Sequence, residues 1–147
     1  MLLRNEGDTE KLAKRLVKLS KQDNTVICLN GDLGSGKTTF TRYFIRNFFK
    51  SLEIKEIPSP TFTLLQVYEH EGHTINHYDF YRLKNSSELF ELNFSEAVTD
   101  DVCLIEWSDK FEEILPNDRV EINFQIKSKV SRSAQITLRG KFKNQKY

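Results

Sequence analysis

The sequence is short of cysteine, and it has few histidines. Of its 147 residues only two are cysteines, and Cys28 and Cys103 both lie inside apolar, strand-like runs. A thiol in such a run packs as a small hydrophobe, which argues against a disulfide framework or a cysteine metal site. The three histidines, His70, His73 and His77, are too irregularly spaced to predict a zinc site.

Charge of one sign and long apolar stretches are also missing. Lys and Arg number 22 and Asp and Glu 21, which leaves a net charge of +1. Without a strong positive field, any contact with RNA must be local. The apolar start, Met1 to Leu3, is too short for a signal-peptide core, and no stretch approaches the roughly 20 apolar residues of a membrane span. We therefore expect a cytoplasmic protein with no membrane partner.

The sequence does contain a glycine-rich segment between an apolar run and a helical pattern. The apolar run is VICL at residues 26–29, and an amphipathic pattern begins at Lys37. The segment between them fits G-x-x-x-x-G-K-[ST], a phosphate-binding loop. We expect the nucleotide to contact Gly31, Asp32, Leu33, Gly34, Ser35, Gly36, Lys37, Thr38 and Thr39.

The residue types of this loop suit nucleoside triphosphates. Glycines let the backbone curl so that successive amide N–H groups point inward, and the helix that follows adds the positive end of its dipole. Lys37 would reach the β- and γ-phosphates, and the Thr38 hydroxyl would ligate a Mg²⁺ ion that bridges the same oxygens. The loop therefore predicts ATP or GTP as the ligand and Mg²⁺ as its companion.

Polar residues outside the loop are candidates for the same site. A stiff, proline-restricted loop at residues 57–62 has hydroxyls in it and just after it, at Ser59, Thr61 and Thr63. One of these hydroxyls could complete a Mg²⁺ shell, as switch hydroxyls do, or the loop could be a surface connector. Asp79 lies near the end of a predicted strand, where it is either a metal or water partner or a turn residue. Glu106 ends the apolar run VCLI as a Walker B acid does, although an ordinary solvated glutamate fits the same pattern.

Periodicity along the chain predicts a single α/β domain over residues 1–147. We expect a first helix over residues 12–19 capped by Asp8 or Thr9, and a second helix with an aromatic stripe directly after the loop. A hairpin of strands 62–70 and 74–82 and a short helix with an Asn85–Glu88 capping box should follow. The last elements expected are a buried strand over residues 102–105, a helix capped by Ser108, and two alternating strands over residues 120–126 and 134–138. The fold predicted is a P-loop NTPase-like three-layer sandwich, whose central sheet is mostly parallel with antiparallel edge strands. Residues 141–147 are expected to fray.

Four motifs together resemble one family, the bacterial TsaE-type ATPases required to make threonylcarbamoyladenosine in tRNA. They are GDLGSGKTT at residues 31–39, SPTF at 59–62, HYDFYRL at 77–83 and LIEW at 104–107. The resemblance implies that Lys37 and Thr38 serve phosphate and Mg²⁺ and that Thr61 sits in a switch-like loop. It also implies that Asp79 and Glu106 line the metal and the attacking water, and that Trp107 lies beside the nucleotide.

The resemblance further implies partners. Proteins of this family work with a TsaD-type carbamoyl-transferase and its non-catalytic TsaB-type paralogue, and ATP hydrolysis resets that complex between rounds of modification. Contact with tRNA would be indirect or local.

Two other functions fit the phosphate loop. A small-molecule kinase uses the same loop, but usually carries a lid with arginines. Here Arg119, Arg132 and Arg139 lie in or beside the predicted C-terminal hairpin, and no arginine is obviously placed beside the loop. A guanine-nucleotide switch would need the base-reading N-K-x-D, which is absent, so adenine is favoured. Without an arginine to neutralise transition-state charge, we expect slow ATP hydrolysis by the isolated protein.

Overall fold

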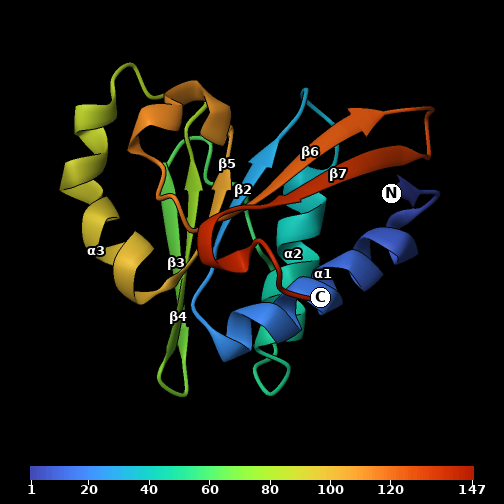
Figure 1. Cartoon of the computed structure of the whole chain (residues 1–147), viewed down its shortest axis with the longest axis horizontal. Helices are drawn as coiled ribbons and strands as arrows, with labels where there is room; N and C mark the ends of the chain where they lie inside the picture. Colours follow the sequence, from blue (N-terminus) through green and yellow to red (C-terminus); the bar gives the residue numbers. More distant parts are fainter.

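A seven-stranded sheet organises the computed structural model, which describes all 147 residues (Figure 1). Its strand order is β1-β7-β6-β2-β5-β4-β3. The strands are β1 (Leu2–Leu3), β2 (Val26–Asn30), β3 (Leu65–His70), β4 (His73–Asp79), β5 (Val102–Glu106), β6 (Val120–Ile126) and β7 (Arg132–Leu138). The α-helices are α1 (Glu6–Gln22), α2 (Lys37–Phe48) and α3 (Phe94–Asp100), and the 3-10 helices are η1 (Ser86–Leu92), η2 (Ser108–Ile114) and η3 (Gly140–Phe142).

The centre of the sheet is parallel and its edges are antiparallel, as the sequence predicts. β2 pairs in parallel with β5 and β6, and β4 pairs in parallel with β5. β3, β7 and β1 add to this centre in antiparallel pairs. Every residue of β2 and β5 is buried, which explains why both read as unbroken apolar runs rather than alternating ones.

Helices cover both faces of the sheet and give the three layers (Figure 1). Ile27 and Leu29 of β2 point into the larger core, which α1 and α2 close. Val26 and Cys28 point the other way, into the smaller core closed by α3 and the 3-10 helices η1 and η2. The predicted aromatic stripe of α2 is confirmed as core, because Phe40, Phe44 and Phe48 are all buried. No helix is both long and apolar enough to cross a membrane.

Two helix starts differ from the prediction. α1 begins one turn early, at Asn5, whose side chain accepts from the Asp8 amide, so neither Asp8 nor Thr9 is the cap. This first turn carries no apolar residue, and periodicity therefore cannot detect it. Ser108 is not a cap either: Trp107 holds that position, and the Ser108 hydroxyl instead donates to Asn30 Oδ1 at 2.7 Å. The capping box of Asn85 with Glu88 is confirmed.

The predicted hairpin is real but shorter. β3 begins at Leu65, because Leu64 takes a left-handed conformation at φ 67° and its amide donates to the Pro60 carbonyl. β4 ends at Asp79, three residues before the predicted end.

Residues 141–147 were expected to fray, but the first two residues of this tail, Lys141 and Phe142, are held in place. Phe142 is 1% exposed and packs in the larger core. Lys141 holds the tail in place, with its Nζ 2.8 Å from Asp23 Oδ2 and its amide donating to Asp118. A single aromatic residue among polar neighbours has no period, so the sequence pattern did not reveal its burial.

Candidate functional site

The loop between β2 and α2 curls because glycines occupy its left-handed positions. Gly31, Gly34 and Gly36 have φ values of 142°, 78° and 113°. At Gly31 an added Cβ would lie 2.6 Å from the Phe124 carbonyl oxygen, so this position excludes any side chain. Gly36 is the N-cap of α2 and has no side chain to occupy the free amides of the first turn. These amides and the helix dipole suit an anion.

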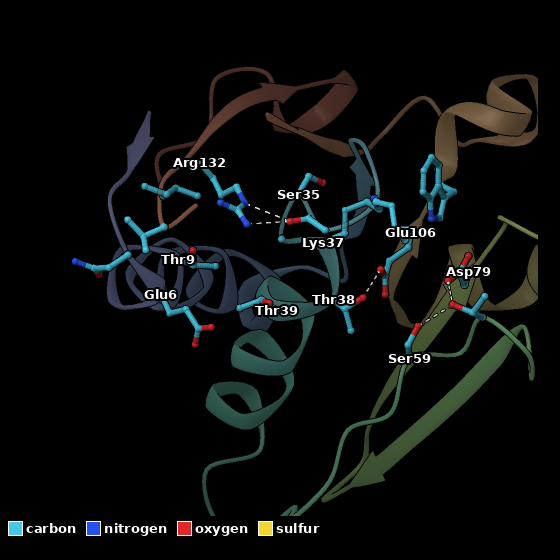
Figure 2. Close-up of a pocket in the computed structure, with 18 of the residues that line it drawn as sticks. Glu6, Thr9, Ser35, Lys37, Thr38, Thr39, Ser59, Asp79, Glu106 and Arg132 are labelled. Carbon is cyan, nitrogen blue, oxygen red and sulfur yellow. Dashed lines mark hydrogen bonds between the residues drawn. The ribbon is translucent and has the colours of Figure 1, made fainter. Parts of the chain in front are cut away.

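A cavity of about 500 Å³ lies along this loop (Figure 2). At one end it is lined by the acidic residues Asp79 and Glu106, together with Thr61 and Trp107. The other end lies between the start of α1 and the β6–β7 hairpin. That end is lined by Leu3, Asn5, Glu6, Thr9, Lys129, Val130 and Arg132.

The acid end is built by the register of two neighbouring strands. Asp79 and Glu106 are paired residues at the carboxyl ends of the parallel strands β4 and β5, and each is 2% exposed. Glu106 Oε1 accepts a hydrogen bond of 2.7 Å from the Thr38 hydroxyl at the start of α2. Asp79 Oδ2 accepts one of 2.9 Å from the Thr61 hydroxyl. Figure 2 shows the contact between Thr38 and Glu106 and the position of Asp79 nearby. Four of the predicted site residues therefore meet here.

Burial shifts the pKa of two charged groups that line the cavity, Asp79 and Lys37. It raises the pKa of Asp79 above 3.8, and hydrogen bonds from the Tyr81 amide and the Thr61 hydroxyl oppose the shift. It lowers the pKa of Lys37, and the carboxylates of Glu106 and Asp79 oppose that shift. Both groups are thus held in a partly desolvated site, where electrostatic interactions with a ligand are strengthened.

Lys37 lies folded over its own loop. Its Nζ donates to the carbonyl oxygens of Gly31 at 2.5 Å and Asp32 at 3.0 Å. The same ammonium lies 4.0 Å from the centre of the Trp107 ring. Trp107 therefore lines the cavity as expected and packs against the loop's lysine.

The donor set of the acid end fits Mg²⁺. This ion prefers oxygen ligands and is usually held by one or two carboxylates together with substrate phosphates. Thr38, Asp79 and Glu106 provide one hydroxyl and two buried carboxylates. No group of three or more His, Cys, Asp or Glu side chains is placed to hold a metal. The arrangement suits an ion that takes its remaining ligands from a phosphate.

A family model described as "Threonylcarbamoyl adenosine biosynthesis protein TsaE" matches residues 3–134. The chain belongs to the TsaE family. The TsaE protein of Rickettsia felis is 43% identical over 92% of this chain and 78% of its own length. That of Haemophilus influenzae is 40% identical over 78% of this chain and 71% of its own. The crystal structure of Bacillus subtilis YdiB matches with a TM-score of 0.69 and 30% identity, and the match covers 97% of this chain and 86% of that one.

Most of the residues predicted from the phosphate-loop motif and from the TsaE resemblance line the cavity. Those that do are Leu33, Gly34, Ser35, Gly36, Lys37, Thr38, Thr39, Thr61, Asp79, Glu106 and Trp107. Gly31 and Asp32 do not line it, and they contribute the backbone carbonyls that hold Lys37. Leu33 stands at its mouth and is 82% exposed.

The structure of this TsaE-family chain also corrects one expectation. An arginine does lie beside the phosphate loop: Arg132 donates to the Gly34 carbonyl from Nε at 3.3 Å and from Nη2 at 3.1 Å. Its Nη1 donates to the carbonyls of Ser128 and Ser131. Arg132 lies at the start of β7 in the β6–β7 hairpin, and 98 residues of sequence separate it from Gly34. No feature of the sequence indicated this placement.

His77 is the second residue that sequence reasoning left out of the site. His77 and Asp79 both lie in the strand predicted over residues 74–82, and their spacing of two puts them on the same face of β4. The pattern could not show that the His77 ring reaches Glu106 on the neighbouring strand, with Nε2 2.5 Å from Oε2.

Proposed function

We propose that this chain is the Mg²⁺-dependent, ATP-hydrolysing subunit of the bacterial system that forms threonylcarbamoyladenosine in tRNA. Its membership of the TsaE family gives it a role in the biosynthesis of that nucleoside. The ATPase activity is supported by one observation above all. Lys37 and Thr38 at the start of α2, Asp79 of β4 and Glu106 of β5 meet at one end of a cavity lined by the phosphate loop.

Each of these side chains has a role set by its chemistry. Lys37 would leave the loop carbonyls and place its charge on the phosphate that is cleaved. Thr38, Glu106 and Asp79 would hold Mg²⁺, and the two carboxylates would also orient the attacking water. The chemistry that Mg²⁺ supplies in such sites is neutralisation of charge on the β- and γ-phosphate oxygens. Thr61, bonded to Asp79, would couple the SPTF loop to the state of the nucleotide.

Adenine is the base that we propose for the other end of the cavity. The sequence lacks the N-K-x-D that reads guanine. The space between the start of α1 and the β6–β7 hairpin is lined by Glu6, Thr9, Lys129 and Arg132. These residues leave room for a nucleoside beyond the phosphates and supply cations next to it.

The isolated protein should hydrolyse ATP slowly. The Arg132 guanidinium is bonded to three backbone carbonyls at the end of the cavity away from Asp79, as Figure 2 shows for its contact with the loop. Lys37 is the cation beside the two carboxylates. An added arginine contributes roughly 10³–10⁵ in rate in related phosphate-loop enzymes, so a partner that supplies or orders one would control turnover.

A surface next to the acid end suits such a partner. Phe62 is 81% exposed with the Arg82 guanidinium stacked 4.8 Å from its ring centre, and Tyr81 is 53% exposed beside Trp107. Aromatic and arginine side chains dominate the binding energy of many interfaces. We propose that a TsaD-type carbamoyl-transferase and its TsaB-type paralogue dock here, and that hydrolysis resets their complex. Any contact with tRNA is local or passes through these partners.

The test is ATP turnover by the purified protein, measured with and without the two partners and a tRNA substrate. We expect slow turnover alone and faster turnover in the assembled complex. A rate that is already high alone and indifferent to the partners would overturn the proposal. Phosphate transfer to a small acceptor instead of water would favour a kinase.

A further inference from the structure

The imidazole of His77 is buried directly behind the acid end of the cavity. The residue is 0% exposed and does not line the cavity. It lies on β4 two residues before Asp79, and its register partner on β5 is Leu104, two residues before Glu106. Its position therefore gives it contact with a carboxylate of the site and none with a ligand in the cavity.

The contact fixes one of the two oxygens of Glu106. His77 Nε2 lies 2.5 Å from Oε2, while the other oxygen, Oε1, accepts from the Thr38 hydroxyl at 2.7 Å. A glutamate side chain has three torsions, and the last is broad and poorly restrained by its own covalent geometry. The plane of this carboxylate is thus set by its partners. The His77 ring is fully buried, whereas Thr38 is half-buried and lines the cavity.

The second ring nitrogen shows which way the hydrogen bond runs. His77 Nδ1 is buried and has no hydrogen-bond partner. A buried N–H group without an acceptor is rarer in proteins than an unpaired acceptor. The proton therefore belongs on Nε2, and His77 donates to the Glu106 carboxylate, which is the arrangement by which outer partners orient metal-binding side chains.

We infer that His77 is a positioning residue that holds Glu106 with Oε1 turned toward Thr38 and the Mg²⁺ of the nucleotide complex. The inference rests on the Mg²⁺-dependent ATP hydrolysis proposed above. Loss of such an outer partner typically lowers metal affinity or activity by about 10–100-fold. We expect a loss of this size in the apparent Mg²⁺ affinity of the nucleotide-bound protein, with little change in nucleotide affinity when Mg²⁺ is removed by EDTA.

A matched pair of amides tests the role. In His77→Gln the side-chain N–H reaches about as far as Nε2, so the bond to Glu106 can form. In His77→Asn the chain is one methylene shorter and the bond cannot form, although polarity is kept. Trp107 is the only tryptophan and lines the cavity, so its fluorescence can follow ATP binding at a series of Mg²⁺ concentrations.

The result expected is a Mg²⁺ affinity near wild type for His77→Gln and about 10–100-fold lower for His77→Asn. ATP affinity in EDTA should be the same in all three proteins. Equal Mg²⁺ dependence in the wild type and both variants would overturn the inference. A parallel loss of Mg²⁺-free binding and of thermal stability in both variants would also overturn it, because it would indicate a structural role alone.

The wild type and Lys37→Met separate failure of this inference from failure of the proposed function. If the wild type shows no Mg²⁺-dependent ATP binding, or if a folded Lys37→Met protein hydrolyses ATP as fast as the wild type, the proposed function fails. If those controls behave as expected and only the His77 pair does not, the inference fails alone.

Nitrogen-15 NMR of the wild type tests the inference even if the His77 variants do not fold. With three histidines in the chain, the His77 ring signals can be assigned as those that remain in both His70→Gln and His73→Gln. We expect a protonated Nε2 and a bare Nδ1, retained when Mg²⁺ and ADP are added. A proton on Nδ1 with a bare Nε2 would overturn the inference.

Discussion

Replacing Lys37 by Met removes the ammonium of the phosphate loop and keeps most of the side-chain length. Loss of one electrostatic contact to the reacting group costs about 10²–10³ in kcat, or about 2.7–4 kcal/mol, in enzymes that stabilise transition-state charge. Lys37 holds the position from which such a contact is made in phosphate-loop enzymes. We therefore expect ATP hydrolysis to fall by at least about 10²-fold.

The same substitution should change stability far less than activity. The ammonium donates to the Gly31 and Asp32 carbonyls and packs on the Trp107 ring, and these contacts are lost. Against this, burial lowers the pKa of Lys37, which means that its charged form is already disfavoured in the fold. The opposing changes should leave a difference of about 1 kcal/mol or less, which is a shift of a few degrees in Tm.

The assay combines phosphate release, ATP binding followed by Trp107 fluorescence, and thermal melting. Lys50→Met is the matched control, because Lys50 is exposed just beyond α2 and does not line the cavity. It should hydrolyse ATP at the wild-type rate. Undiminished hydrolysis by a folded Lys37→Met protein would refute the assignment of the phosphate loop.

Further substitutions test the rest of the site and the tail. Asp79→Asn and Glu106→Gln should each retain ATP binding but hydrolyse it more slowly in single-turnover assays, because they remove charge beside Mg²⁺ and water and preserve size. Since burial raises the pKa of Asp79 above 3.8, the folded state holds its proton to higher pH than the unfolded state does. The Asp79 contribution to the free energy of unfolding should therefore fall as pH rises from 3.8 through the folded pKa, and Asp79→Asn should gain stability relative to wild type over that window in denaturant titrations without nucleotide. Arg132→Ala should weaken ATP binding measured by calorimetry, whereas Arg132→Lys should restore only part of it, because a lysine cannot reproduce the forked contact. Phe142→Ala should lower the free energy of unfolding by about 3–5 kcal/mol in urea, and a value near zero would show that the tail frays after all.

The phosphate loop was predictable because its determinants are local. The turn from β2 into α2 depends on glycines at Gly31, Gly34 and Gly36 and on residues within a few positions of them. Lys37 and Thr38 follow at fixed places on the first turn of the helix. In such a segment, neighbouring residues determine both the backbone conformation and the groups that bind phosphate. The buried parallel strands could be predicted for a similar reason, since full burial on both faces leaves an unbroken apolar run.

The two candidate carboxylates were only partly predictable from the sequence. The predicted strand pattern placed Asp79 near the end of β4, and the apolar run of β5 placed Glu106 at its end. Taken alone, Asp79 also fitted a turn residue and Glu106 also fitted an ordinary solvated glutamate. The parallel register that pairs them, which the order β2-β5-β4 makes possible, turned two separate candidates into one site.

Tertiary structure alone decided which other residues belong to that site. His77 reaches Glu106 because β4 and β5 are neighbours, although 29 residues separate the two in sequence. Arg132 reaches Gly34 because the β6–β7 hairpin folds back over the loop, and Phe142 fills the core because Lys141 and Asp23 hold the tail against it. His77 belongs to the HYDFYRL motif and to a predicted strand, but neither pattern shows what its ring contacts. Arg132 and Phe142 belong to no periodic pattern or local motif. Their roles follow from contacts between distant segments, which exist only once the sheet has assembled.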